Sequence, residues 1–346
     1  MKKLLNTVYV TTEGAALRKD GENLVAHVEG EPERRAPFHM LSSIVVFGAI
    51  FVSPALIAAC ASAGISIVLL DRVGRFQARI EGPVSGNVLL RRAQYRTADG
   101  NTGLEIVRSI VLGKLANQRS VLQRVLRDHG EGLAATARDD IRMASRRLEL
   151  LLQGAVIQAT SIDALRGYEG DAGRLYFSVF DHLIRSPDEA LKFTGRSRRP
   201  PLDPVNALLS FLYTLLTHDC RSALEGVGLD PAVGFLHRDR PGRPSLALDL
   251  MEELRPALAD RLALSLLNRR QLRAADFIVS DSGAVSLKDD ARKTVLTAWQ
   301  ERKREERIHD FVAERAPIGL IPHLQALLLA RHLRGDLDGY PPLFWK

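Results

Sequence analysis

Cysteine is scarce in this chain of 346 residues, which contains only Cys60 and Cys220, far apart in the sequence. Two isolated cysteines exclude a disulfide framework and a zinc cluster built on cysteine, and they suit a reducing cytoplasm. Several catalytic signatures are also missing: G-x-S-x-G, a Walker A loop, G-x-G-x-x-G after a strand, H-E-x-x-H and C-x-x-C. These absences argue against the hydrolases, nucleotide-binding proteins and zinc proteases that carry them.

Uninterrupted apolar helices are lacking as well. The uncharged run over residues 40–70 is long enough to cross a bilayer, but Gly48, Pro54 and Gly64 break it. Ser53 and Pro54 form an N-cap followed by a proline in the first helical turn. We therefore expect a buried strand, helix and strand at residues 44–51, 54–62 and 65–70, and no membrane partner. The opening residues Met1, Lys2 and Lys3 lack the apolar stretch of a secretory signal.

Basic residues exceed acidic ones. Forty-eight Lys and Arg face 41 Asp and Glu, which leaves a net charge of +7. This surplus favours a polyanionic partner without naming it, and a merely soluble basic protein is an equal alternative.

The periodicity of the sequence changes near residue 88. Before it, β-prone stretches surround a hairpin turn at residues 19–22, and after it residues 104–127 and 133–158 have helical periodicity. We predict an α+β protein with a small β-rich domain at residues 1–88 and a larger, all-α domain at residues 89–346. A basic, exposed loop over residues 194–204 is expected to end at Asp203, which caps a helix that starts with Pro204. Pro256 should end or kink a helix near Arg255.

Glu169 is the first candidate for a functional carboxylate. It lies in the segment RGYEGDAGRLYF, capped by Ser161, and shares a helix face with the apolar residues Leu165, Ala172 and Tyr176. A salt bridge to Arg166, one turn earlier, is the simpler structural explanation. The glycines at 167, 170 and 173 indicate that another helix or a phosphate approaches this backbone closely.

His237 is the second candidate. It precedes a loop with Arg238, Arg240 and Arg243, and Ser245 can cap the following helix. Asp249 and Glu252 lie three residues apart on that helix, so an imidazole and two carboxylates converge. One nitrogen and several oxygens suit Mg²⁺ or Mn²⁺, and nearby arginines suit phosphodiester chemistry. The alternatives are a structural histidine and a solvated loop.

These two segments and the helix between them resemble CRISPR-associated protein 1, the integrase of spacer acquisition. The motif RGYEG matches at Glu169, GLDPAVGFLH matches at His237, and Glu252 matches the third acidic position. Asp249 matches an acidic position one turn earlier and is either an additional ligand or a supporting residue. Asn206 in DPVNALLSFLYTLL matches an asparagine of the intervening helix. The similarity covers essentially the whole chain, and its length and opening segment are most like subtype I-C.

The resemblance implies a homodimer that assembles with CRISPR-associated protein 2, and with CRISPR-associated protein 4 as a further partner, while the β-rich domain serves dimerisation and partner contact. The substrates implied are a short DNA duplex with 3′-hydroxyl ends and the CRISPR repeat, joined by transesterification with associated endonuclease activity. Glu169, His237 and Glu252 would be the catalytic metal ligands. DNA contacts would come from these residues: Arg166, Asn206, Arg196, Arg198, Arg199, Arg238, Arg240 and Arg243.

Two other functions remain open from the residues alone. A general metal-dependent nuclease of DNA repair would use the same side chains without a repeat substrate. A non-catalytic scaffold that binds nucleic acid would need the carboxylates only as structural ion pairs.

Overall fold

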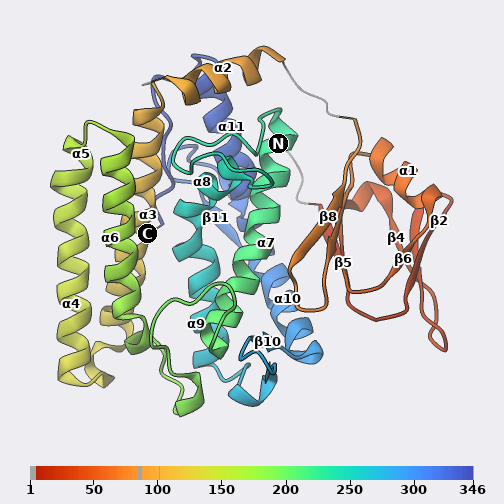
Figure 1. Ribbon diagram of the computed structural model, residues 1–346, viewed down its shortest axis with the longest axis horizontal. Helices are drawn as coiled ribbons and strands as arrows, with labels where there is room; N and C mark the ends of the chain where they lie inside the picture. The colour runs from red at the N-terminus through yellow and green to blue at the C-terminus, as the bar shows by residue number, and fades with distance from the viewer. Residues whose placement is uncertain (1–4, 84–87, 101, 346) are drawn as a thin grey trace. The chain divides into compact units, whose positions relative to one another are not determined.

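A computed structural model describes residues 5–83, 88–100 and 102–345 of the chain (Figure 1). The chain divides into two units, one of Met1–Ser85 with Arg292–Thr297, and one of Gly86–Ala291 with Ala298–Lys346. The first is β-rich and the second mainly helical, which confirms the predicted fold class. No sequence signal indicated that residues 292–297, part of helix α10 (Asp289–Arg304), belong to the first unit.

One sheet of the first unit has the strand order β1-β5-β7-β8. Its strands are β1 (Asn6–Val10), β5 (Leu41–Phe47), β7 (Ser66–Leu70) and β8 (Phe76–Ile80). The first three are parallel and β8 is antiparallel to β7. Helix α1 (Pro54–Ser62) precedes β7, and the Ser53 hydroxyl accepts a hydrogen bond from the Leu56 amide at 3.3 Å. The predicted order of strand, capped helix and strand is therefore confirmed, but the first strand ends at Phe47 and does not extend to residue 51.

The second sheet has the order β4-β3-β2-β6. Its strands are β4 (Arg34–Pro37), β3 (Asn23–His27), β2 (Ala16–Asp20) and β6 (Phe51–Val52). The predicted turn joins β2 to β3, where Gly21 has a positive φ of 56° that glycine adopts at low cost. Strands β4 and β6 were not predicted, because they are short and lack alternating apolar residues.

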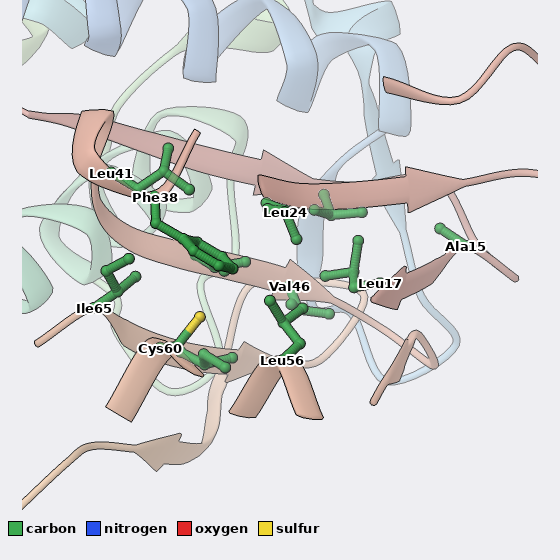
Figure 2. Close-up of a cluster of buried hydrophobic side chains, with 12 residues drawn as sticks. Ala15, Leu17, Leu24, Phe38, Leu41, Val46, Leu56, Cys60 and Ile65 are labelled. Atoms are coloured by element: carbon green, nitrogen blue, oxygen red, sulfur yellow. The ribbon is translucent and has the colours of Figure 1, made fainter. Parts of the chain in front are cut away.

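Side chains from both sheets and α1 form the core of the first unit (Figure 2). Leu17, Leu56 and Cys60 are fully buried in it, and Leu24 and Val46 are almost so. The apolar run over residues 40–70 is thus accounted for by core packing. In the described part of the chain, no helix has both the length and the apolar character needed to cross a bilayer.

Helix α3 (Gly103–His129) is the long central element of the second unit and packs against α4, α6 and α8 (Figure 1). The other helices of this unit are α2 (Val88–Asp99), α4 (Ala135–Leu150), α5 (Val156–Gln158), α6 (Ile162–Ser178), α7 (Pro204–Val227), α8 (Ser245–Leu254), α9 (Arg261–Asn268) and α11 (Ile321–Leu333). The prediction of an all-α domain missed two antiparallel pairs, β9 (Phe277–Val279) with β10 (Val285–Leu287) and β11 (Glu306–Ile308) with β12 (Arg315–Pro317).

Proline 256 produces a change of helix type. Helix α8 ends at Leu254 and continues as a π-helical segment, Arg255–Asp260, before α9 begins. Proline has no amide hydrogen to donate within a helix, so the regular α-helical bonding cannot continue through it. The predicted break near Arg255 is confirmed, and it brings Arg255 and Asp260 into the irregular turn.

The segment 340–345 is packed against α3 and α8. Glu253 of α8 is fully buried, and its carboxylate accepts hydrogen bonds from the Tyr340 hydroxyl and, at 2.7 Å, from the Leu343 amide. Burial raises the pKa of Glu253 to about 7. On α3, the Asn117 side chain donates to the Leu343 carbonyl at 2.9 Å and accepts from the Trp345 amide at 2.6 Å.

Gly113→Ala should destabilise the second unit by about 1–3 kcal/mol through overpacking. A Cβ atom at Gly113 would lie 3.0 Å from Glu253 Oε2 and 3.1 Å from Pro342 Cβ, where α3 meets α8 and the tail. Urea unfolding followed by tryptophan fluorescence reports on this unit, because it contains both tryptophans, Trp299 and Trp345.

Gly173→Ala in α6 is the matched control, since among the described residues no atom outside the helix's own backbone lies within 4 Å of its Cβ position. It should leave stability unchanged or raise it by up to about 1 kcal/mol, the helix preference of Ala over Gly. Equal effects of the two substitutions would contradict the close packing of α3 on Glu253.

Candidate active site

Glu169 projects from α6 beside the central helix α3. The Ser161 hydroxyl caps α6 by accepting from the Ala164 amide at 3.2 Å, as predicted, and Leu165 and Tyr176 bury one face of the helix. The Glu169 carboxylate, 26% exposed, forms an ion pair with Lys114 of α3. The predicted alternative, a salt bridge from Glu169 to Arg166, is wrong.

Arg166 has other partners instead. Its guanidinium donates to Asp163 and to the backbone carbonyl of Leu236, both at 2.5 Å. This second bond ties α6 to the residue that precedes His237. Arg166 therefore connects the two segments that the sequence singled out.

The three glycines of α6 leave open space beside the helix. Within the described residues, nothing lies within 4 Å of a Cβ position at Gly167 or Gly173, and Gly170 has only the Arg174 guanidinium at 3.9 Å. No neighbouring helix therefore accounts for them in that part of the chain. The other explanation, approach of a phosphate, stays a prediction.

Asp249 fixes the position of His237. The Asp249 carboxylate is fully buried and accepts from the backbone amides of Phe235, Leu236 and His237 at 2.6–2.9 Å. It also lies 2.6 Å from His237 Nδ1. Because an ionised carboxylate only accepts, Nδ1 carries a proton in this bond, and Nε2 is the ring nitrogen that remains for another partner.

Ser245 does not cap α8, contrary to the prediction. It is the first residue of the helix, after Pro244, and its hydroxyl donates to the Arg238 carbonyl at 3.2 Å. The backbone of the loop after His237 is thereby held at Arg238 to the start of the helix that carries Asp249.

Glu252 is almost fully buried, with 2% of its side chain exposed, among three basic groups. Its carboxylate lies 2.6 Å from Lys114 Nζ, 2.8 Å from Arg255 Nη1 and 3.8 Å from His237 Nε2. Burial alone would raise the pKa of Glu252, but Arg255, Lys114 and His237 outweigh it and lower the value to about 2. Glu252 is therefore ionised at neutral pH despite its burial.

Lys114 links the two acidic residues, because its ammonium contacts both Glu169 and Glu252. The sequence analysis missed both Lys114 and Arg255. The available signal for Lys114 was a lysine at helical spacing from Val107, Ile110 and Val111, on a face that is otherwise buried. In the described part of the chain, no group of three or more His, Cys, Asp or Glu side chains is arranged so that it could hold a metal ion.

Tyr213 of α7 packs on Arg255. The guanidinium of Arg255 lies 5.0 Å from the centre of the Tyr213 ring, and that of Arg196 lies 5.2 Å from the same ring centre. The Tyr213 hydroxyl donates to Asp260 at 2.6 Å. Burial raises the pKa of Asp260 to about 6 and outweighs this hydrogen bond.

The loop over residues 194–204 is partly buried. Arg198 and Arg199 are exposed as predicted, but Arg196 packs on aromatic rings and burial lowers its pKa, so the prediction is wrong for Arg196. Asp203 caps α7 by accepting from the Asn206 amide at 2.8 Å, as predicted.

Asn206 itself is fully buried. Its side chain donates to the Gly195 carbonyl and to Asp203, and it accepts from Arg196 and from the Ser197 amide. All four of its hydrogen-bonding positions are thus used to hold the loop.

The loop after His237 carries the other predicted arginines. Arg238 is 71% exposed and lies 3.1 Å from Asp163, and Arg240 is exposed. Partial burial lowers the pKa of Arg243, and the charges of Arg240, Arg199 and Arg255 lower it further. The charges of Arg199 and Arg255 therefore act on the loop that carries Arg243. We use the name arginine rim for the arginines of the two basic loops: Arg198, Arg199, Arg238, Arg240 and Arg243.

A helical unit with two carboxylates and an imidazole beneath an arginine rim has the features of an enzyme that acts on nucleic acid. The sequence matches the family model of the CRISPR associated protein Cas1 over residues 8–301. The chain belongs to this family, as the sequence predicted, and is accordingly an enzyme of the Cas1 endonuclease type.

Related sequences extend over the whole chain. It is 68% identical over 346 residues to the CRISPR-associated endonuclease Cas1 2 of Rhodospirillum rubrum and 52% identical over 347 residues to Cas1 1 of Chlorobaculum tepidum, with 100% of each chain covered. A CRISPR-associated exonuclease Cas4/endonuclease Cas1 fusion of Geobacter sulfurreducens is 36% identical, and the match covers 96% of this chain and 59% of the fusion.

Solved structures share the fold. A Cas1 protein from Thermotoga maritima has a TM-score of 0.80 at 24% identity, with 95% of this chain and 97% of that chain covered. A casposase bound to integration product has a TM-score of 0.83 at 20% identity, with coverages of 99% and 95%. A Cas6-RT-Cas1–Cas2 complex has a TM-score of 0.82 at 22% identity, with coverages of 100% and 36%.

Asp249→Asn should lower the free energy of unfolding by about 2–4 kcal/mol, because an amide cannot accept from three backbone amides and an imidazole at once. The His237 ring should also lose its fixed orientation, which nitrogen NMR of the imidazole would detect as a change of tautomer. Asp239→Asn, an exposed change in the same loop, is the control and should alter neither quantity. An unchanged His237 tautomer in Asp249→Asn would refute the orienting role.

Asp260→Asn should remove a pH dependence of stability. The folded-state pKa of about 6 lies above the ordinary 3.8, so the folded protein holds this proton more tightly than the unfolded chain. The contribution of Asp260 to stability is therefore greatest below pH 3.8 and falls as the pH rises to about 6. Urea unfolding from about pH 4 to about pH 7 should show the variant gaining about 1–3 kcal/mol on the wild type. A constant difference would contradict the raised pKa.

Proposed function

We propose that this enzyme inserts short DNA duplexes into a CRISPR repeat array by metal-dependent transesterification. In the same site, water in place of the attacking hydroxyl would give endonuclease activity. The observation that carries the proposal is the convergence of Glu169 and Glu252 on one cationic group, the Lys114 ammonium, next to the imidazole of His237.

The chemistry of these side chains would suit a divalent ion. Two carboxylates already bind a cation at one point, and His237 has Nε2 available because Asp249 holds Nδ1. Carboxylate oxygens with one imidazole nitrogen suit Mg²⁺ or Mn²⁺. Glu169, His237 and Glu252 would hold the ion, and Asp249 would act by orienting His237. When bound, the ion would stabilise the negative charge that develops on the phosphate.

The chain's own residues would orient the DNA. In the reaction, a 3′-oxygen of the incoming duplex forms a bond to phosphorus in the repeat, the bond to the displaced 3′-oxygen breaks, and that oxygen receives the proton lost by the attacking hydroxyl. The number of phosphodiester bonds is unchanged, so no external energy source is needed. Lys114 and Arg255 would balance the charge of the carboxylates and the phosphate.

The arginine rim would bind backbone phosphates next to this centre, with salt-sensitive affinity and little sequence preference. Arg166 would act by tying α6 to the His237 segment, and Arg196 and Asn206 by holding the loop that carries Arg198 and Arg199. The open side of α6 at Gly167 and Gly173 would let a strand pass close to the helix backbone.

The proposed assembly is a homodimer with a Cas2 partner and, as a further partner, Cas4. The complex whose name contains Cas1–Cas2 and the relative in which Cas4 is fused to Cas1 support these two partners. The β-rich unit would provide the dimer and partner contacts. A cytoplasmic location and subtype I-C stay predictions from the sequence.

A joining assay tests the function. A short duplex with free 3′-hydroxyls, a supercoiled plasmid with a CRISPR repeat, the Cas2 partner and Mg²⁺ or Mn²⁺ should give joined strands. Glu169→Ala and His237→Ala should each reduce joining by at least about 100-fold, and a chelator should abolish it. Glu105→Ala, which removes a carboxylate that is 68% exposed and paired with Arg108, is the control and should retain wild-type joining.

The other outcomes identify the alternatives. Cleavage without joining, still dependent on Glu169 and His237, would favour a general repair nuclease. Wild-type activity in both variants would refute the proposed site. An absence of any joining or cleavage, with DNA binding retained, would leave a nucleic-acid scaffold in which the carboxylates are structural.

A further inference from the structure

A second group of arginines surrounds Trp345, away from the carboxylates. The guanidinium carbons of Arg307, Arg302 and Arg261 lie 4.1, 5.6 and 5.9 Å from the centre of the indole ring. These three residues come from β11, α10 and α9, and we call them, with Trp345, the Trp345 cluster. Trp345 itself is 4% exposed.

The Trp345 cluster is held by the central helix α3. The Asn117 side chain accepts from the Trp345 amide, and the Ser120 hydroxyl donates to the Trp345 carbonyl, both at 2.6 Å. With the backbone fixed on both sides, the ring is held in place. Arg124, one turn beyond Ser120, adds its positive charge to the same neighbourhood.

The acidic residues nearby act on the other arginines, and the charge of Glu305 acts on Arg261 as well. Asp128 pairs with Arg124 at 3.1 Å, Glu305 pairs with Arg302, and the charge of Asp310 acts on Arg307. Arg261 forms no hydrogen bond or ion pair with the residues that the structure describes. Burial lowers the pKa of Arg261 to about 10, with further lowering from Arg124, Arg302 and Arg307. No carboxylate of the described residues therefore lies within ion-pair distance of the Arg261 guanidinium.

The Trp345 cluster also contains a hydrogen-bond donor that is not used. The buried Nε1 of Trp345 has no acceptor among the described residues. Guanidinium and indole nitrogens only donate, and leaving a buried donor unused costs about 1–3 kcal/mol. The Arg261 guanidinium and the Trp345 indole N–H, which have no acceptor among the described residues, are complementary to an oxyanion with several oxygens.

We propose that the Trp345 cluster binds one phosphate group of a DNA backbone, with Arg261 and the Trp345 indole as its donors. This inference rests on the proposed function in taking DNA as the substrate. Lys114 and Arg124 are both on α3, and their ten-residue separation corresponds to about 15 Å along the helix axis. That distance corresponds to about four nucleotides of a duplex strand at 3.4 Å each, which is the spacing that one strand would need to contact both places.

Arg261→Gln tests the proposal, with Arg142→Gln as the control because Arg142 on α4 is 61% exposed and outside the cluster. Affinity for a short duplex is measured by fluorescence anisotropy without divalent metal, from about 50 to about 200 mM salt. Arg261→Gln should weaken binding by about 3- to 10-fold at the lower salt and reduce the salt slope by about 1. Arg142→Gln should stay within about 2-fold of wild type.

Inorganic phosphate separates the possible sources of the anion. It should raise the melting temperature of the wild type above that in sodium chloride of equal ionic strength, and this gain should be lost in Arg261→Gln. Loss of the phosphate effect with an unchanged DNA salt slope would mean a site for free phosphate and would overturn the proposal. No phosphate effect in the wild type, or no change in either measurement, would overturn it as well.

Trp345→Phe keeps the proposal testable if Arg261→Gln fails to fold. The phenyl ring retains an aromatic contact for the arginines but lacks the N–H donor, so binding should weaken by about 3-fold in the same assays. Wild-type affinity in a folded Trp345→Phe would refute the role of the indole. Because binding is measured without metal, failure of the joining reaction would count against the proposed function and not against this site.

Discussion

The geometry of the site depends on one shared cation, the Lys114 ammonium between Glu169 and Glu252. Glu169 and Glu252 come from different helices, and without the lysine their carboxylates would repel each other. Glu252 is too deeply buried for water to screen this repulsion. Loss of one partner from such a buried pair typically costs about 3–5 kcal/mol. The lysine therefore fixes how α3, α6 and α8 pack together. A divalent ion entering the same position would replace the positive charge that the lysine supplies.

Helix α3 contributes residues to three parts of the enzyme. Lys114 faces the carboxylates, Asn117 and Ser120 bind the tail at Trp345, and Arg124 adds charge to the second arginine group. These residues lie within three turns of one rigid element. The candidate active site and the proposed phosphate site consequently have a fixed separation along α3, which suits a substrate with regularly spaced charges.

The features that the sequence predicted correctly are those that depend on near neighbours. The cap at Asp203 and the break at Pro256 each follow from residues within one helical turn, so they were visible in the sequence. Lys114 precedes Glu169 by 55 residues, and only tertiary packing decides that it, rather than Arg166, neutralises the carboxylate. The family resemblance supplied the order of the acidic residues and histidine, but it did not reveal the basic groups between them.

The tail contacts have a consequence for the order of folding. The bond from the Trp345 amide to Asn117 closes a separation of 228 residues, and that from Leu343 to Glu253 closes 90. Contacts so distant in sequence form late, because the entropy of closing the intervening chain is lost before they contribute. During synthesis, the helix that carries Glu252 and Glu253 therefore lacks its contacts with the tail until residues 340–345 have left the ribosome.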